Sequence, residues 1–241
     1  MTYNKDDLLY KVYLSEQSER FEDMVSAMKA VIKIAANLTH FERNLFSMAN
    51  KNVIQPLRRS LRIVISILQK QSTDSSVTDI NNRLTLELKW KIQRQIRGIC
   101  REVLQILDKQ LIPKASTAES KVFYYKMKGD YYRYLAETET DFSRKVDSVN
   151  SLLAYNYATD IANRELSPTH PNRLGLCLNF SVFIYEILNC RKRAVSIAEN
   201  GFNNAINDLN NLSEENYDDA FVILYLLKEN ILYWTHGVQQ N

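Results

Sequence analysis

The sequence has few of the residues that interrupt helices. Among its 241 residues there are only 5 glycines and 4 prolines. Because glycine and proline mark most turns, a chain with so few of them favours long helices over many short strands. The composition, 45% hydrophobic and 24% charged, excludes an intrinsically disordered or fibrous protein.

Cysteine is scarce, and the patterns of enzymes are missing. Cys100, Cys177 and Cys190 lie far apart and none belongs to a CxxC pair, so we expect neither a disulfide framework nor a zinc site. The sequence has no HExxH, GxSxG, P-loop or GxGxxG motif. His170, between two prolines, is interpreted as structural. We therefore expect no catalysis, no metal and no cofactor.

Long apolar runs and a strong charge excess are absent as well. No apolar run is long enough to span a bilayer, and the polar N-terminus lacks the apolar region of a signal peptide. The formal net charge of +3 is too small for nucleic-acid binding by bulk charge, so an anion site would have to be local. These features predict a reduced, cytoplasmic protein without membrane insertion.

Helical periodicity predicts nine helices and no strand, and hence one all-α domain of antiparallel hairpins over residues 1–241. Two short helices should meet near residues 18–20. A capping box, Thr39 with Glu42, should begin a long helix that ends at about Gln71. After a polar loop at 72–76, the remaining helices are expected at about 78–111, 119–137, 145–165, 172–189, 192–210 and 215–236.

Several local features refine this pattern. Pro113 should end the helix that begins at about Thr78, and residues 138–144 should form a loop. A second capping box is expected at residues 116–119, and Ser213 with Asn216 can form a local cap. The helix over 78–111 should bury an apolar stripe formed by Leu84, Leu88, Ile92, Ile96, Ile99, Val103 and Ile106.

The helix over residues 119–137 has the most unusual face. Helical spacing places five residues in one stripe: Lys126, Gly129, Asp130, Arg133 and Tyr134. Two cations and a phenol can bind an anion, with Asp130 holding the cations in position. From spacing alone, solvated charges paired at i,i+4 are the more common explanation.

Other helices offer groups that suit the same kind of ligand. Lys51 and Arg58 are seven residues apart and so share a helical face, about 10 Å apart along the axis. Asn179 and Asn230 each lie within an apolar stripe, where an amide can pair with the backbone of an extended peptide. A single asparagine at the margin of a core stripe has an ordinary structural explanation, and periodicity does not show that these faces meet.

Together, these segments resemble the 14-3-3 family. The blocks that carry the resemblance occur in family order from about residue 6 to residue 235, at 43–47, 51–53, 119–137, 168–171, 173–182, 185–189, 210–217 and 226–234. The chain is identified as a divergent member. The resemblance implies nine antiparallel helices in a cup-shaped homodimer, or a heterodimer with another family member. Residues to about 111 would form the dimer interface and the groove floor, and residues 118–236 would complete the groove.

By matched position, the resemblance also assigns roles to individual residues. The phosphate of a phosphoserine or phosphothreonine client would contact Lys51, Arg58, Arg133 and Tyr134, with Lys126 nearby. The peptide backbone would be held by Asn179 and Asn230. The groove wall would comprise Leu178, Val182, Glu186, Val222, Ile223, Leu226, Tyr233 and Trp234, with Glu186 and Trp234 at its margin. The dimer interface would comprise Leu14, Ser18, Arg20, Asp23, Ser60, Leu88 and Lys91.

The chain departs from the family pattern at several positions. Gln55-Pro56 replaces a Gly-Ala-type pair between Lys51 and Arg58, and a proline inside a helix costs roughly 3 kcal/mol unless its surroundings compensate. Tyr233 stands where an aliphatic residue is usual. Gln95 replaces the acidic partner expected for Arg20, although Asp23 and Lys91 can form the neighbouring pair, so we expect the dimer to survive. The long acidic tail of many members is not present in this sequence.

These observations predict a non-enzymatic, dimeric adaptor for phosphorylated clients, in the eukaryotic cytoplasm and able to shuttle to the nucleus. An alternative is a helical scaffold that binds partners independently of phosphate because Pro56 disturbs the pocket. A third is a helical enzyme or nucleic-acid binder in which Tyr131, Tyr132 and Tyr134 stack on bases. Ser60 matches a family position at the dimer interface, where a phosphate would oppose dimerisation.

Overall fold

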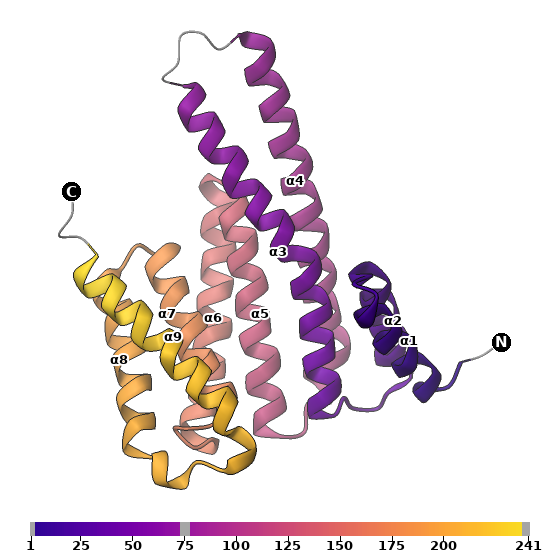
Figure 1. The fold of residues 1–241 in the computed structure, drawn as a ribbon, viewed down its shortest axis with the longest axis vertical. Helices are drawn as coiled ribbons and strands as arrows, with labels where there is room; N and C mark the ends of the chain where they lie inside the picture. Colours follow the sequence, from indigo (N-terminus) through magenta and orange to yellow (C-terminus); the bar gives the residue numbers. More distant parts are fainter. Residues whose placement is uncertain (1–2, 73–77, 238–241) are drawn as a thin grey trace. The chain divides into compact units, whose positions relative to one another are not determined.

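The computed structural model describes residues 3–72 and 78–237, with the side chain of Asp141 left out. The chain divides into two compact units, residues 1–114 and 115–241. Within the described residues there are nine α-helices and no strand (Figure 1), so the predicted all-α class is confirmed. The single domain over 1–241 stays a prediction. Apart from Ser72, which caps α3, the predicted loop at 72–76 lies outside the described residues.

The first unit contains four α-helices. They are α1 (Lys5–Gln17), α2 (Phe21–Ile34), α3 (His40–Gln71) and α4 (Asp79–Ile106), and each packs against the next (Figure 1). The prediction that Pro113 ends the last of these helices is wrong in detail. The backbone changes to a π-helical turn at Leu107–Leu111, and Pro113 lies inside a 3-10 turn at Ile112–Lys114.

The second unit contains five α-helices and two 3-10 turns. The helices are α5 (Ala118–Thr138), α6 (Asp141–Glu165), α7 (Pro171–Glu186), α8 (Arg191–Asn207) and α9 (Tyr217–His236). The turns, Leu209–Asn211 and Glu214–Asn216, connect α8 to α9. Consecutive helices pack together, and α7 also contacts α5 and α9. Because α7 contacts all four other helices of its unit, its side chains can contribute to more than one site.

Side-chain caps fix where several helices begin. In the predicted capping box of α3, the backbone N–H of Glu42 donates to the Thr39 hydroxyl at 3.2 Å, and that of Thr39 donates to the Glu42 carboxylate at 2.9 Å. The second predicted box is displaced by one residue, because α5 is capped by Thr117 with Ser120. The predicted loop at 138–144 is too long, since α6 begins at residue 141.

Of two further positions expected near helix starts, one caps its helix and the other does not. His170 accepts a hydrogen bond of 3.1 Å at Nδ1 from the backbone N–H of Asn172 and so caps α7, which confirms its structural role. The Asn216 side chain donates to the Ser213 hydroxyl at 2.9 Å, but neither side chain accepts from a backbone N–H at the 3-10 turn or at α9, so the predicted cap by these two residues is wrong. The His170 contact satisfies a backbone N–H at the start of α7 that has no partner within the helix.

The expected buried stripe of α4 is only partly buried. Ile92, Ile96, Val103 and Ile106 are buried as predicted, and Ile99 is half-buried. Leu84 and Leu88 are 54% and 48% exposed in the single chain, so their predicted burial is wrong here. Cys100, which the prediction omitted, is fully buried. Periodicity identifies the apolar side of a helix, but it does not show how far along the helix the neighbours reach.

Candidate functional site

Asp130 on α5 is the centre of a buried polar network in the second unit. Its Oδ1 accepts a 2.6 Å hydrogen bond from the Tyr155 hydroxyl on α6. The Asn179 amide on α7 donates to both of its carboxylate oxygens, at 2.9 and 3.0 Å. On α5 itself, Lys126 and Arg133 lie 3.4 and 3.5 Å from the carboxylate. Asp130 therefore lies between the two cations, as predicted, and also connects three helices.

Arg133 is held on several sides by this network. Besides Asp130, its guanidinium pairs with Glu137 at 3.4 Å, donates to the Tyr155 hydroxyl at 3.4 Å, and lies 4.8 Å from the centroid of the Tyr134 ring. Burial alone would lower the pKa of Arg133. Its tyrosine neighbours and the carboxylates of Asp130 and Glu137 raise the pKa well above the ordinary value. Arg133 is thus a fixed, permanently charged donor.

Tyr155 is the member of the network that the sequence analysis missed. It is fully buried, and its ring stacks on Phe180 with the centroids 5.2 Å apart. Burial, followed by the charge of Asp130, raises the pKa of Tyr155 well above the ordinary value of 10.0. The hydroxyl is therefore protonated at neutral pH and donates to Asp130.

A glycine allows Tyr155 to reach Asp130. A Cβ atom at Gly129 would lie 2.8 Å from ring carbons of Tyr155, closer than van der Waals contact permits. The Ser151 hydroxyl, one turn earlier on α6, donates to the Gly129 carbonyl at 2.9 Å. A glycine inside a helix often marks such a close approach. Gly129 was therefore the sequence signal for a partner helix, but it did not identify the partner.

Lys51 and Arg58 lie on α3 in the first unit. Lys51 is exposed, whereas Arg58 is buried and donates from Nη1 to the Gln55 side chain at 3.1 Å. α3 continues through the exposed Pro56, so the proline does not end the helix. Gln55, part of the departure from the family pattern, instead orients Arg58. Because Arg58 and Arg133 belong to different units, their joint role stays a prediction.

The predicted groove wall comes from α7 and α9. Leu178, Val182 and Ile223 are half-buried, whereas Val222, Leu226, Glu186 and Tyr233 are exposed. A Cβ atom built at Gly175 on α7 would lie 3.9 Å from Ile223, so the two helices approach closely here. Asn230 is half-buried on α9. The apolar members of this set therefore lie, half-buried or exposed, on two helices that pack together, and their joint role as a groove wall stays a prediction.

Trp234 requires a correction. The family resemblance implies a place at the groove margin, but its side chain is only 3% exposed and its ring stacks on Tyr185 with the centroids 4.8 Å apart. Trp234 therefore belongs to the core between α7 and α9. A large aromatic ring near a helix end can pack inward or line a groove, and spacing does not distinguish the two.

The predicted dimer residues lie on the surface of the first unit. Leu14 and Leu88 are each 48% exposed. Exposed polar positions of this set are Ser18, Arg20, Asp23, Ser60 and Lys91. Arg20 forms an ion pair with Asp23 of the same chain, so Asp23 already has one cationic partner. Single exposed leucines are ordinary on a protein surface, so the role of these two in a dimer stays a prediction.

Within residues 3–72 and 78–237, no cluster of three or more histidine, cysteine, aspartate or glutamate side chains could hold a metal ion. In the same ranges, none of the helices is long and apolar enough to cross a membrane. Cys100, Cys177 and Cys190 are free thiols.

A family model and several known proteins match this chain over nearly its whole length. A family model described as "14-3-3 protein" matches residues 11–235. The chain is 48% identical to 14-3-3 protein epsilon of Drosophila melanogaster, over 98% of this chain and 89% of that protein. It is 49% identical to the checkpoint signal transducer rad24 of Schizosaccharomyces pombe, over 99% and 87%. It is also 46% identical to 14-3-3-like protein B of Vicia faba, over the whole chain and 91% of that protein.

Proposed function

Because the chain belongs to the 14-3-3 family, we propose that it is a dimeric adaptor for client segments that contain phosphoserine or phosphothreonine. Members of this family are adaptors and not enzymes, which agrees with the absence of catalytic motifs from the sequence. Binding of client proteins and dimerisation are general properties of the family. The dependence on phosphate and the residues that read it are the parts of the proposal that require a test.

The observation that best supports phosphate binding is the position of Arg133. A guanidinium can grip a phosphate dianion bidentately, and charge-assisted hydrogen bonds are worth roughly 1.5–3 kcal/mol each. Asp130, Glu137 and the Tyr155 hydroxyl already fix the Arg133 side chain in the free protein. A side chain that is ordered before binding loses less conformational entropy when the ligand arrives.

We propose that the phosphate also contacts Lys51, Arg58 and Tyr134, with Lys126 close by. Gln55 supports this role of Arg58, because it fixes the guanidinium through a 3.1 Å hydrogen bond. A phosphate needs several donors at once, since its three terminal oxygens each accept more than one hydrogen bond. These additional donors would make the protein bind phosphorylated segments more tightly than unphosphorylated ones.

The peptide itself would lie against α7 and α9. The N–H groups of the Asn179 amide donate to Asp130, so we propose that its oxygen accepts a hydrogen bond from the peptide backbone. Asn230 would hold the backbone on α9. Leu178, Val182, Val222, Ile223 and Leu226 would contact apolar peptide side chains, with Glu186 and Tyr233 beyond them. Trp234 would support this wall from the core.

Fluorescence anisotropy with a phosphopeptide and its unphosphorylated twin tests the proposal. We expect the phosphopeptide to bind at least about tenfold more tightly, and the Arg133→Lys variant to lose most of that difference because lysine cannot bind bidentately. The control is Arg164→Lys on the exposed side of α6. Equal affinity for the two peptides would refute the proposal. Equal affinity would instead favour the alternative, a scaffold that binds partners independently of phosphate because Pro56 disturbs the pocket. The helix α3 continues through Pro56, which does not support that alternative.

We further propose that the dimer forms through Leu14, Ser18, Arg20, Asp23, Ser60, Leu88 and Lys91. Ser60 is exposed in the single chain and so accessible to a kinase before assembly. A phosphate there would place nearly two negative charges in a packed contact. Analytical ultracentrifugation of Ser60→Glu should show weaker dimers than Ser60→Ala, and a fully dimeric Ser60→Glu protein would count against this role. We place the protein in the cytoplasm, with shuttling to the nucleus, which imaging of a tagged chain can check.

A further inference from the structure

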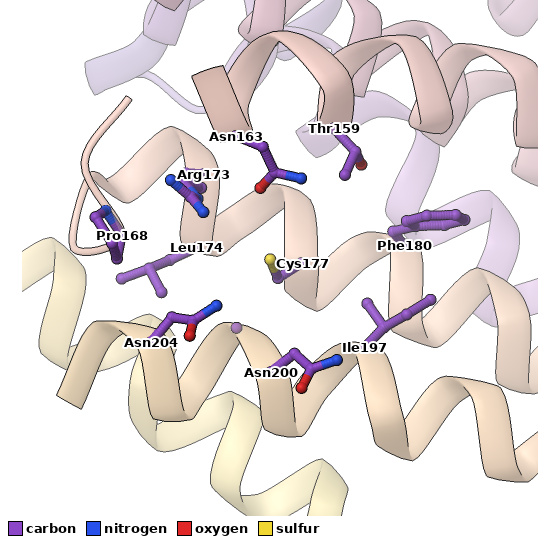
Figure 2. A pocket seen from close by; sticks show the side chains of 11 residues that line it. Thr159, Asn163, Pro168, Arg173, Leu174, Cys177, Phe180, Ile197, Asn200 and Asn204 are labelled. Atoms are coloured by element: carbon purple, nitrogen blue, oxygen red, sulfur yellow. The ribbon is translucent and has the colours of Figure 1, made fainter. Parts of the chain in front are cut away.

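The second unit contains a cavity that the proposed peptide site does not use. It has a volume of about 310 Å³ and lies between α6, α7 and α8 (Figure 2). Its lining comprises Thr159, Asn163, Pro168, Arg173, Leu174, Cys177, Phe180, Ile197, Asn200, Gly201 and Asn204. On α7, Arg173, Cys177 and Phe180 face this cavity, whereas helical spacing puts Asn179 and Val182 on the opposite side. A ligand here would therefore not occupy the proposed peptide groove.

The two ends of the cavity differ in chemistry. Arg173 on α7 lies at one end with Asn163 on α6 and Asn204 on α8 (Figure 2). Phe180 and Ile197 lie at the other end, seven residues further along α7 and seven back along α8. Seven residues correspond to about 10 Å along a helix. The cavity is thus polar and cationic at one end and apolar at the other.

Arg173 is the only charged residue in the lining and is well placed to bind an anion. Its Nη1 donates a 2.7 Å hydrogen bond to the Leu166 carbonyl, which fixes the guanidinium. A guanidinium has five N–H donors, so further donors remain to be directed at a ligand. Asn163 and Asn204 add side-chain amides, which can donate to an anion as well.

The middle of the cavity is mixed, with the thiol of Cys177 on α7, the amide of Asn200 on α8 and the hydroxyl of Thr159 on α6 (Figure 2). Burial raises the pKa of the Cys177 thiol, against the opposing effect of Arg173, so the thiol is neutral at physiological pH. A neutral cysteine behaves as a small apolar side chain. A Cβ atom at Gly201 on α8 would lie 2.9 Å from both Cβ and Sγ of Cys177, so α7 and α8 are in contact here and Cys177 and Gly201 form a wall of the cavity. Leu174 also lines the cavity, on the Arg173 side of the thiol (Figure 2).

We propose that this cavity binds a small carboxylate with an apolar body, such as an arylalkanoate. The carboxylate would pair with Arg173 and accept hydrogen bonds from Asn163 and Asn204. The aromatic or branched body would extend past Cys177 toward Phe180 and Ile197. A mostly apolar pocket with a few polar groups at one end is the usual architecture of a small-molecule site, and about 310 Å³ lies within the size range of such sites.

Calorimetric titration with 4-phenylbutyrate and its neutral amide, 4-phenylbutyramide, tests the proposal. The carboxylate should bind about tenfold or more tightly than the amide, because only the carboxylate gains a charge-assisted pair. In a ¹H–¹⁵N NMR spectrum, its addition should shift the side-chain amide signals of Asn163, Asn200 and Asn204. Absence of binding at millimolar concentration, or equal affinity of the two probes, would overturn the proposal.

Two variants identify the site. Asn204→Asp adds a negative charge at the cationic end at almost unchanged size, and Asn203→Asp is its matched control on the neighbouring exposed position outside the lining. Asn204→Asp should weaken carboxylate binding by about fivefold or more, and Asn203→Asp should not. Equal effects of the two variants would refute the assignment.

The third variant separates this cavity from the proposed phosphate site. Arg133→Lys alters the proposed phosphate site, so it should leave phenylbutyrate affinity unchanged while it weakens phosphopeptide binding. Loss of phenylbutyrate binding in Arg133→Lys would show that the probe enters the peptide groove and would overturn the proposal. Because the readout is the small probe, the outcome does not depend on whether phosphopeptides bind.

Discussion

The Tyr155 hydroxyl on α6 donates a 2.6 Å hydrogen bond to Asp130. This hydrogen bond holds the Asp130 carboxylate in its position between Lys126 and Arg133. Gly129 makes this approach possible because it has no side chain to meet the Tyr155 ring. The position of the proposed phosphate-binding arginine is thus determined by a tyrosine that does not itself belong to the proposed binding surface.

The raised pKa of Tyr155 predicts a dependence of stability on alkaline pH. The folded protein holds the phenol proton more tightly than the unfolded chain, whose tyrosines titrate near 10.0. The stabilisation from this proton is complete below pH 10. As the pH rises above 10, the free energy of unfolding falls by up to about 1.4 kcal/mol per pH unit. Urea unfolding of the wild type and Tyr155→Phe between pH 8 and 11 measures it. The difference between the two proteins should shrink above pH 10, and a constant difference would contradict the assignment.

A pair of glycine substitutions tests the contact between α5 and α6. Gly129→Ala should destabilise the protein by about 1–3 kcal/mol, because its Cβ would meet the buried Tyr155 ring at 2.8 Å. Gly98→Ala on α4 is the matched control, since a Cβ there meets nothing within 4 Å. It should stabilise the protein by about 0.5–1 kcal/mol through helix propensity. In thermal unfolding, the midpoint temperature should fall for Gly129→Ala and rise for Gly98→Ala.

The cost of Pro56 to the stability of α3 can likewise be measured by substitution and unfolding. It lies inside α3, lacks the N–H for a helical hydrogen bond, and is exposed. Pro56→Ala should therefore raise the free energy of unfolding by about 1–3 kcal/mol. Pro113→Ala, in a 3-10 turn, should have a smaller effect. We expect phosphopeptide affinity to change less than twofold in Pro56→Ala, and a large gain would show that the proline disturbs the proposed pocket.

The exposed leucine on α4 offers a test of assembly. Leu88 is 48% exposed in the single chain, and its burial in a dimer would be favourable by about 1–2 kcal/mol. Leu88→Asp should shift the protein toward monomers in sedimentation velocity, because a charge in the contact would be costly to desolvate. Ile206→Asp, at an exposed apolar position on α8, is the control. Equal sedimentation of both variants would place the interface elsewhere.

Much of the fold was predictable because local signals decide it. The Thr39 and Glu42 capping box and the apolar periodicity of most helices were read directly from the sequence. Errors occurred where the signal was ambiguous by a residue or two. Thr117 rather than Ser116 caps α5, and Pro113 is accommodated in a 3-10 turn after a π-helical segment. Helix ends depend on such local choices, which periodicity does not determine.

The site was less predictable because it depends on contacts between helices. The stripe on α5 identified Lys126, Asp130 and Arg133, but helical spacing within one segment contains no information about Tyr155, 25 residues away. The inward packing of Trp234 was missed for the same reason. The cavity behind α7 needs three helices to form, and no motif marks it.

The convergence on Asp130 has a consequence for how this protein can evolve. Lys126, Arg133, Tyr155 and Asn179 all have the same carboxylate as a partner, so the cost of replacing one depends on whether the others are still present. A first substitution leaves a buried charge with fewer partners, so the cost of a second substitution differs from its cost in the intact network. Double-mutant cycles should therefore show strong epistasis among these four positions. They are expected to be retained or lost as a group rather than one at a time.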